Sequence, residues 1–430
     1  MTLTLIITIF TSGLLIASCL FLPKIKIGKV SLSTYWIAAL SGAILLFATG
    51  RITFSEFFEG VSASGGMNPL KILTLFVSMT MLSVFLDEVG LFAYLANEAL
   101  KKSGDSQIKL FATLFLAVGL LTVFTSNDVV VLTFTPFICQ FCKRAKVNPL
   151  PYLFAEFVAA NSFSMVLIIG NPTNIYLGAF SELTFWEYLK AMILPTLVCG
   201  AAEFLTLYLI FRKELKKPMQ AEEEEVQIKS KGLLIMGIAH LSVCIVLLAI
   251  SAYIHIEMWI LTLCFAVSLF FCATLYALKK HKYFSVETDT LKRVPAEIIP
   301  FVLSMFAVVL SLEKCGVTAI IAEALSGGEE VFTYGITSYL ASNVVNNIPM
   351  SVLFSSVLKS GGGVGAVYAS IVGSNLGATL TPIGALAGIM WQNILKKNDV
   401  KMTFVTFLKY NIAPSVVSLL VTLGVLCLIV

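Results

Sequence analysis

The sequence predicts an all-α polytopic membrane protein with two inverted repeats, about ten transmembrane helices, two re-entrant hairpins and two helices broken at mid-membrane. The first observation is composition: 58% of the 430 residues are hydrophobic and only 13% are charged. A soluble domain carries about a quarter charged residues, so a chain with this composition is better suited to a lipid bilayer than to water. The second observation is a series of long apolar runs, and the third is a set of polar motifs that recurs in the second half. Strands of a β-barrel are about 10 residues long and alternate, whereas these runs are longer and continuously apolar.

Ten apolar stretches are predicted to be membrane segments. The first lacks the charged head and small-residue cleavage site of a signal peptide, so we expect a retained helix. Glycine and proline interrupt the fourth and ninth stretches, which we therefore predict to be broken helices. The ten stretches are 3–22, 31–49, 69–87, 149–180, 186–211, 232–251, 257–278, 296–312, 366–394 and 404–430.

Two further stretches, 107–142 and 331–358, are apolar but carry polar residues in the middle. We predict a re-entrant hairpin for each; two short spans or one broken span are the alternatives. Basic residues flank the first hairpin on both sides, which places both of its ends in the cytoplasm. The second is flanked by acidic residues and a glycine run, which suit the outside. Alternation through ten spans then puts both termini outside a prokaryotic inner membrane.

The polar motifs divide the chain into two halves, 1–212 and 232–430, joined by a hydrophilic linker, 213–231, predicted to be a solvated cytoplasmic connector. Ser126-Asn127 recurs as Ser342-Asn343, an offset of 342 − 126 = 216, and Asn161 recurs as Asn375, an offset of 375 − 161 = 214. The two hairpins open to opposite sides, so the repeats are inverted. Inverted repeats are typical of secondary transporters, whose site lies at the repeat interface near the bilayer midplane.

Polar, irregular backbone at membrane depth is tolerated only when it is buried in protein or lines a wet cavity. Freed carbonyls and Asn, Ser and Thr oxygens can then bind Na⁺ or a polar solute. The alternative is that these residues kink helices and bond neighbouring helices together. The candidate Na⁺ ligands are Ser126, Asn127, Ser342 and Asn343. The full set of candidate substrate or ion ligands is Ser126, Asn127, Asp128, Asn161, Asn171, Thr173, Asn174, Ser342, Asn343, Asn346, Asn347, Ser374, Asn375, Thr379 and Thr381.

Among the acids, Asp128 is the candidate proton carrier, because a carboxylate at a hairpin tip in hydrocarbon is costly and indicates function. Local backbone N–H groups that satisfy this carboxylate are the alternative. Asp87 and Glu88 lie at a span end, where we expect them to reach water. Glu156 and Glu203 lie deeper and are interpreted as structurally paired acids, with a second titrating site as the alternative for each.

Other chemistry finds no support in the residue pattern. No nucleophile–base pair, metal-ligand spacing or phosphate-binding GxxxxGK[ST] occurs in the sequence, which argues against an enzyme. The basic residues lie in loops and orient the helices, so we expect no nucleic-acid partner. We expect no cofactor, only H⁺ or Na⁺ as a coupling ion.

The residues Ser126 to Asp128 with Thr135-Pro136, the run Asn346-Asn347-Ile348-Pro349, and the stretch from Tyr368 to Trp391 resemble the ion transporter superfamily. The resemblance covers most of the chain and is strongest to the branch of arsenite permeases and NhaD-type antiporters. This branch is related to divalent-anion/sodium symporters, with a citrate-transporter-like domain. The resemblance implies a scaffold domain, a transport domain of hairpins and broken helices, elevator-like motion and a homodimer, with a soluble ATPase partner if the protein is of the arsenite type. Asn161 and Asn375 depart from the aspartates that arsenite permeases tend to carry there.

The predicted function is proton-coupled efflux of arsenite or antimonite. Arsenite is a small uncharged trihydroxide at neutral pH, which a site of amides and hydroxyls suits. A sodium-coupled symporter of a dicarboxylate, citrate or sulfate is one alternative, and a sodium/proton antiporter is another. A membrane receptor or non-transporting subunit is the alternative from a different class.

Overall fold

The computed structural model describes residues 1–22, 24–27, 30–63, 68–181, 183–219 and 227–430. Almost all of its regular structure is helical, and the fold class of an all-α polytopic membrane protein is confirmed. The first half contains α1 (Thr2–Phe21), α2 (Tyr35–Ala48), α3 (Phe54–Ser62), α4 (Pro69–Val89), α5 (Leu91–Ser103), α6 (Gln107–Phe124), α7 (Asn127–Ala145), α8 (Leu150–Phe163), the 3₁₀ turn η1 (Ile168–Gly170), α9 (Pro172–Phe180) and α10 (Phe185–Leu215).

The second half contains a matching series of helices. These are α11 (Lys231–Ala249), α12 (Ser251–Ile254), α13 (Met258–Lys280), α14 (Phe284–Arg293), α15 (Ile298–Lys314), α16 (Val317–Leu325), α17 (Glu330–Val345), α18 (Asn347–Ser360), α19 (Val364–Leu380), α20 (Leu386–Lys397) and α21 (Phe404–Leu426). Within the described residues, 8 helical stretches are long and apolar enough to cross a membrane, and α2 and α19 are shorter apolar helices. The chain is therefore a multi-pass membrane protein.

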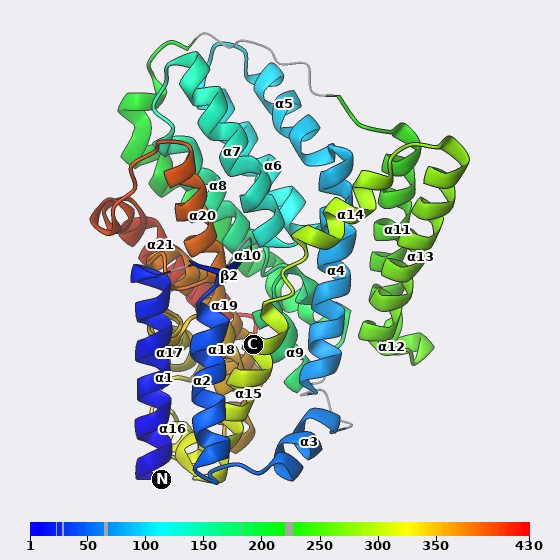
Figure 1. Ribbon diagram of the computed structural model, residues 1–430. Helices are drawn as coiled ribbons and strands as arrows, with labels where there is room; N and C mark the ends of the chain where they lie inside the picture. The colour runs from blue at the N-terminus through cyan, green and yellow to red at the C-terminus, as the bar shows by residue number, and fades with distance from the viewer. Residues whose placement is uncertain (23, 28–29, 64–67, 182, 220–226) are drawn as a thin grey trace.

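Two pairs of helices are interrupted where the sequence predicts hairpin tips. α6 ends at Phe124 and α7 begins at Asn127, while α17 ends at Val345 and α18 begins at Asn347. Figure 1 shows α6 and α7 in the upper half of the molecule and α17 and α18 in the lower half. The 18 residues of α6 rise by about 27 Å at 1.5 Å per residue, so by length alone this arm nearly matches the hydrocarbon core.

The predicted broken helices are each divided in two. The first becomes α8, η1 and α9, and the second becomes α19 and α20. Glycines permit close backbone approach at both breaks: a Cβ on Gly170 would lie 2.1 Å from the Ser164 carbonyl oxygen, and one on Gly384 would lie 2.5 Å from the Gly377 carbonyl oxygen. Larger side chains are excluded there, which explains glycine at both positions.

Some boundaries differ from the prediction. The predicted segment 31–49 begins as a helix only at Tyr35, because residues 30–33 pair with residues 24–27 in an antiparallel β-hairpin. The alternation of Lys and Ile in Lys24–Ile27 is a period-two strand signal that the helical prediction overlooked. The helix α10 also extends to Leu215, so the linker starts later than predicted, and the linker's acidic run Glu222 to Glu225 lies outside the described residues.

The loops contain amphipathic helices that the prediction omitted. The clearest is α3, whose first turn has a capping box: the Thr53 side chain accepts from the Glu56 N–H, and the Glu56 carboxylate accepts from the Thr53 N–H. This Thr-x-x-Glu pattern is visible in the sequence. The others are α5, α14 and α16.

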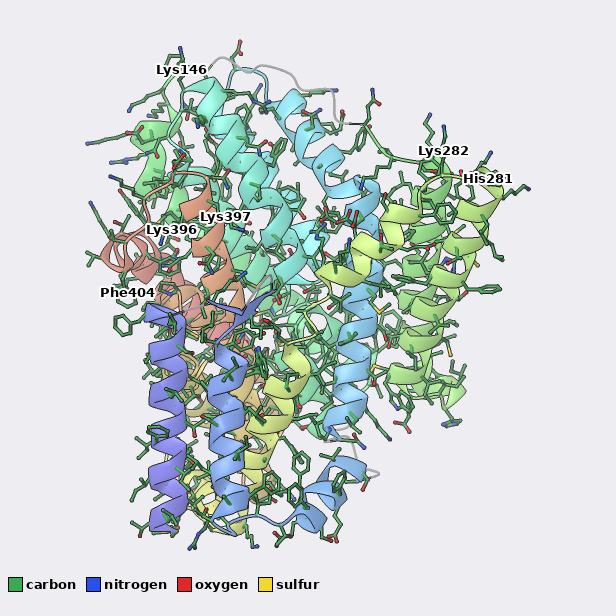
Figure 2. The ribbon with its side chains drawn as sticks, in the orientation of Figure 1. Lys146, His281, Lys282, Lys396, Lys397 and Phe404 are labelled. Carbon is green, nitrogen blue, oxygen red and sulfur yellow. The ribbon has the colours of Figure 1, made fainter. Side chains whose placement is uncertain are left out.

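Basic loops gather toward one end of the molecule. Figure 2 shows Lys146 and Lys282 near its upper end and Lys396 and Lys397 in its upper half. The N-terminus lies at the lower end in Figure 1. The C-terminal region reaches the start of α17, where Cys427 contacts the Glu329 carboxylate. The extent of the two repeats and their orientation in a membrane stay predictions.

Candidate functional site

The two broken helices meet at Asn375 of α19. Its side-chain oxygen accepts from the Asn171 amide at 2.9 Å and lies 3.0 Å from the Ser164 hydroxyl oxygen, whose one proton is directed to the closer Asn161 carbonyl. Its amide nitrogen donates to the Asn174 side-chain oxygen at 2.7 Å and to the Ile371 carbonyl at 2.8 Å. The side chain thus makes four polar contacts, and three of them join the break after α8 to the middle of α19.

The tip of the first hairpin joins this network through Asn161. Asn127, the first residue of α7, donates from its side-chain amide to the Asn161 side-chain oxygen at 3.3 Å. Asn161 donates to the Phe157 carbonyl, and its own carbonyl accepts from Ser164 at 2.6 Å. A continuous chain of amides and hydroxyls therefore runs from the hairpin tip to Asn375. All of its members are buried.

The tip of the second hairpin binds the break between α19 and α20. Asn343 accepts from the Thr381 hydroxyl at 2.6 Å, and Asn346 donates to the Ile383 carbonyl at 3.1 Å. The backbone N–H of Asn347 donates to the Gly384 carbonyl at 2.9 Å. Asn346 has φ of 73°, a left-handed conformation that asparagine tolerates better than most residues. Each hairpin tip thus contacts the break of its own half, and Asn375 links the halves; no hydrogen bond in the described chain joins Asn127 to Asn343.

Three side-chain oxygens of the candidate residues are buried and have no hydrogen-bond partner among the described residues. They are Ser126 Oγ at the first tip, Asn347 Oδ1 at the second tip, and Ser374 Oγ beside Asn375. A buried polar atom without a partner costs about 1–3 kcal/mol. These three oxygens are therefore the part of the site with hydrogen-bonding capacity left for a bound ion, solute or water.

Three other candidates point elsewhere. The Thr379 hydroxyl, one turn along α19 from Asn375, bonds to Ser415 of α21 at 2.9 Å. The Ser342 hydroxyl bonds to the Ser338 carbonyl within its own helix. The nearest polar partner of the Thr173 hydroxyl is the adjacent Asn174 at 3.5 Å. These contacts are those of helix-stabilising hydroxyls.

Asp128 lies beside Asn127 but faces a cavity of about 240 Å³ between α4, α7, α15 and α20. Its backbone N–H donates to the Asn127 side chain, whereas its carboxylate has no hydrogen-bond partner in the described structure. Basic side chains line the same cavity: Lys24, Arg293 and Lys397. A second, more open cavity shares Leu132, Arg293 and Ile394 with the first. Lys397, which Figure 2 shows in the upper half of the molecule with Lys396, thus lines the cavity that Asp128 faces.

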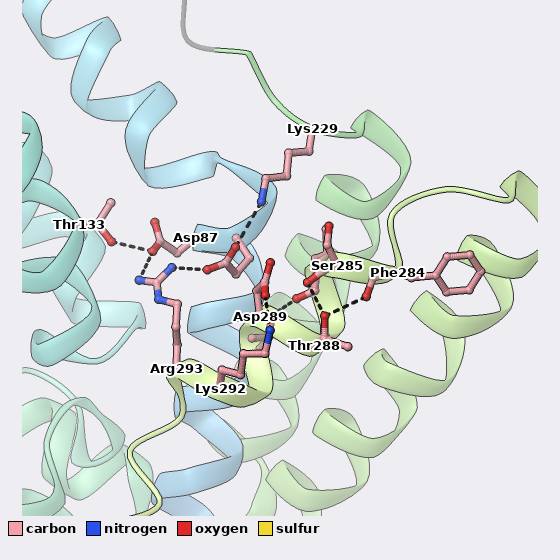
Figure 3. Close-up of polar contacts among 12 residues, drawn as sticks. Asp87, Thr133, Lys229, Phe284, Ser285, Thr288, Asp289, Lys292 and Arg293 are labelled. Atoms are coloured by element: carbon pink, nitrogen blue, oxygen red, sulfur yellow. Dashed lines mark hydrogen bonds and ion pairs between the residues drawn. The ribbon is translucent and has the colours of Figure 1, made fainter. Parts of the chain in front are cut away.

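Beside this cavity, Asp87 of α4 forms an ion pair and is buried from water. The prediction that it reaches solvent is therefore wrong. Its carboxylate lies 2.5 Å from the Arg293 guanidinium, and its side chain is only 4% exposed. Arg293 also binds Glu88 at 2.6 Å, and the Thr133 hydroxyl of α7 donates to Asp87 at 2.7 Å. Figure 3 shows these contacts, with Lys229 reaching Glu88 from the linker. The cluster fastens the first hairpin to α4 and α14.

Replacing Arg293 with alanine is expected to lower the unfolding free energy by roughly 2–3 kcal/mol. A fully buried carboxylate that loses its partner costs about 3–5 kcal/mol, and partial exposure of the guanidinium reduces this. The measurement is the thermal unfolding midpoint in detergent. Lys292→Ala is the matched control, because its ion pair with Asp289 is exposed. Equal midpoints for the two variants would show that Asp87 does not depend on Arg293.

Ser164 is the residue of the network that the sequence analysis missed. It contacts both Asn161 and Asn375, yet it belongs to none of the motifs that recur in the second half. Its position three residues after Asn161, on the same helical face, is the only signal that could have found it.

Comparison with known proteins places this arrangement in a family. Residues 27–365 match the family model CitMHS, described as "Citrate transporter". A protein of Escherichia coli named "Arsenical pump membrane protein" is 24% identical over 416 residues, covering 91% of this chain and 93% of the relative. A "46 kDa membrane protein" of Mycobacterium leprae is 26% identical over 405 residues, covering 89% and 91%.

Solved structures show the same fold. The Alcanivorax borkumensis YdaH transporter matches with a TM-score of 0.60 at 15% identity, over 99% of this chain and 97% of that chain. Neisseria gonorrhoeae MtrF, described in its title as illuminating a class of antimetabolite efflux pumps, matches with a TM-score of 0.55 at 15% identity, over 99% and 94%. The resemblance to the ion transporter superfamily is confirmed, and the protein is an ion-driven membrane transporter. With more than half of its length matched by the family model, the chain belongs to the citrate transporter family CitMHS.

Proposed function

We propose that the protein exports arsenite or antimonite in exchange for protons. The observation that carries the proposal is the pairing of two features at one hairpin tip: a neutral, amide-rich network on one side and an unpartnered carboxylate, Asp128, in an open cavity on the other. The network suits the solute, and the carboxylate suits the proton.

The chemistry of the network favours an uncharged polyhydroxy solute. No Lys, Arg or acidic side chain bonds to the chain of contacts from Asn127 to Asn375 in the described structure. Arsenite as the trihydroxide offers three O–H donors and oxygen acceptors. Ser126 Oγ, Asn347 Oδ1 and Ser374 Oγ are each buried without a partner in the described structure, so each could accept such a donor. Several relatives carry the name arsenical pump membrane protein, which supports the same substrate.

The position of the cavity supports the proposed orientation in the membrane. Because basic loops mark the cytoplasmic side, the Asp128 cavity faces the cytoplasm in this conformation, and both termini lie outside. An elevator-like motion would carry the hairpins and broken helices across the membrane, and the Asp87 cluster is then a contact that forms in the inward-facing state. The homodimer and the soluble ATPase partner that the resemblance implies stay predictions.

Everted membrane vesicles test the function. With the protein present, a pH gradient that is acidic inside the vesicle is expected to drive accumulation of arsenite, and a proton ionophore to abolish it. Replacement of sodium by choline is expected to leave accumulation unchanged. No accumulation of arsenite or antimonite in vesicles that retain the protein and the gradient would reject the proposal.

A sodium-coupled anion symporter is the second candidate, and the cavity gives it specific support. Lys24, Arg293 and Lys397 line the entrance and would attract a carboxylate or sulfate. The family description as a citrate transporter points the same way. In proteoliposomes, this candidate predicts citrate or dicarboxylate uptake that requires sodium and persists when the proton gradient is collapsed.

Replacing Ser374 with alanine is expected to raise the KM for arsenite by about 10-fold, equivalent to one lost hydrogen bond of about 1.4 kcal/mol. The unfolding midpoint should stay unchanged, because Ser374 Oγ has no hydrogen-bond partner among the residues that the structure describes. Initial rates over a range of arsenite concentrations give the KM. Ser360→Ala, at the exposed end of α18, is the control. An unchanged KM would remove Ser374 from the binding site.

A further inference from the structure

A second carboxyl group, Glu156 of α8, lies fully buried close to the transport machinery. It is held between three elements that the proposed function assigns to the moving part. The Thr135 hydroxyl of α7 lies 3.0 Å from Glu156 Oε1, and the Trp391 indole N–H of α20 donates to Glu156 Oε2 at 3.1 Å. One hairpin arm and one half of each broken helix therefore meet at this carboxyl.

The number of available protons decides the state of this group. A threonine hydroxyl carries one proton. The Thr135 oxygen lies 2.6 Å from the Val131 carbonyl, which can only accept, and this is the shorter of its two hydrogen bonds. The Thr135 proton therefore belongs to the bond with Val131, so the proton between Thr135 and Glu156 must come from Glu156. The hydrogen-bond chain runs from the Trp391 N–H through a neutral carboxylic acid and Thr135 to Val131.

The apolar surroundings of Glu156 also favour the neutral acid. Aromatic rings enclose this region: Trp391 lies 4.9 Å from Phe157 and 5.7 Å from Phe154, measured between ring centroids. No Lys, Arg or His of the described chain forms an ion pair with Glu156. An unpaired charge in such an environment is far more costly than a neutral acid.

Few titratable groups face Glu156 from the elements packed around it. The helix α7 contributes the buried Cys139 thiol, and α10 contributes the Glu203 carboxyl, which bonds to Ser162 further along α8. The remaining charged residues on these elements lie nearer the helix ends. They are Lys109 on α6, Asp128, Lys143 and Arg144 on α7, Glu187, Lys190, Arg212, Lys213 and Glu214 on α10, Lys396 and Lys397 on α20, and Lys409 on α21.

The position of α20 connects this buried acid to water. Leu386, Ile389 and Met390 of α20 line the Asp128 cavity, whereas Trp391 of the same helix is buried and bonds to Glu156 of α8. A single helix thus separates the cavity from Glu156.

On α7, Thr135 follows Asp128 by seven residues, or about two turns along the same face. A displacement of α20 away from α8 would expose Glu156 to the cavity and remove its Trp391 donor.

We propose that Glu156 is a second proton-binding site, which is protonated in this conformation and exchanges its proton when α20 separates from α8. This inference rests on the proposed function for its role in coupling, whereas the protonation itself rests on the contacts alone. Asp128, open to the cavity, and Glu156, closed behind α20, would then bind protons in different conformations of the cycle.

The variant Glu156→Gln distinguishes a proton-binding site from a residue that only holds the helices together. The glutamine amide reproduces the contacts of a neutral acid, since its oxygen accepts from Trp391 and its NH₂ donates to Thr135. If Glu156 only holds the helices together, transport by this variant should be unchanged. The proposal predicts that pH-driven arsenite accumulation falls about 10- to 100-fold, while the unfolding midpoint and arsenite counterflow at equal pH are retained. Glu313→Gln, an acid paired with Lys359 away from the site, is the control and should resemble the wild type.

Infrared spectroscopy of the purified protein provides a readout that does not depend on transport. The carbonyl stretch of a protonated carboxyl is expected in the wild type and missing in Glu156→Gln. Trp391→Phe, which removes the N–H donor, should shift this band to higher frequency, so the assignment does not rest on one variant. An absent band, or wild-type accumulation by Glu156→Gln, overturns the proposal. If the wild type itself shows no proton-driven flux, the proposed function fails, and the band alone then decides whether Glu156 holds a proton.

Discussion

Asp128→Asn is expected to reduce proton-driven arsenite accumulation in everted vesicles by about 100-fold, the upper part of the range for coupling between two bound ligands. The amide cannot bind or release a proton, yet it keeps the size of the carboxylate and the backbone contact with Asn127. Arsenite affinity should change little, because the network that suits the solute lies on the other side of the tip. The residual rate should also lose its dependence on pH.

The control for this variant is Asp289→Asn, which neutralises an exposed acid on α14. It is expected to match the wild type in rate and pH dependence. Transport by Asp128→Asn at the wild-type rate with the wild-type pH profile would remove Asp128 from the mechanism.

Asn375→Ala is expected to abolish transport and to lower the unfolding free energy by about 2–5 kcal/mol. Truncation leaves the Asn171 amide and the Asn174 side-chain oxygen without their partner in a buried region. Each buried polar group left unpaired costs about 1–3 kcal/mol. The measurements are the unfolding midpoint in detergent and arsenite flux in proteoliposomes.

The comparison with Ser374→Ala makes this prediction specific. Ser374 is the neighbouring buried residue, but its hydroxyl has no partner in the described part of the chain. Its loss should therefore weaken arsenite binding without a change in stability. Asn398→Ala removes one partly buried contact to the Ile394 carbonyl near the end of α20. It should change arsenite binding and the unfolding free energy only slightly. Equal stability of Asn375→Ala and the wild type would show that Asn375 does not join the two halves.

The sequence predicted the interruptions well because helix breakers and polar residues in an apolar run are local signals. The breaks after Phe163 and Leu380 and the tips near Asn127 and Asn347 follow directly from such residues. The amides of Asn127, Asn161 and Asn375 were selected for the same reason, and they are part of one network in the structure.

What the sequence did not predict depends on how helices cross. Thr379 looked equivalent to Asn375, but it lies one turn further on α19 and faces α21. Ser164 carries no unusual signal, and only the approach of α19 makes it a partner of Asn375. Asp87 was expected to reach water because its partner, Arg293, is distant in the sequence. Pairings of this kind are set by tertiary packing rather than by local pattern.

Coupling between arsenite and protons is the central claim, and reciprocal flux tests it most directly. Purified wild-type protein in proteoliposomes, with an arsenite gradient but no pH or sodium gradient, is expected to move protons in the direction opposite to arsenite, as followed with a pH-sensitive dye. Arsenite that crosses the membrane without any movement of protons, or protons that stay still while sodium moves, would contradict the account.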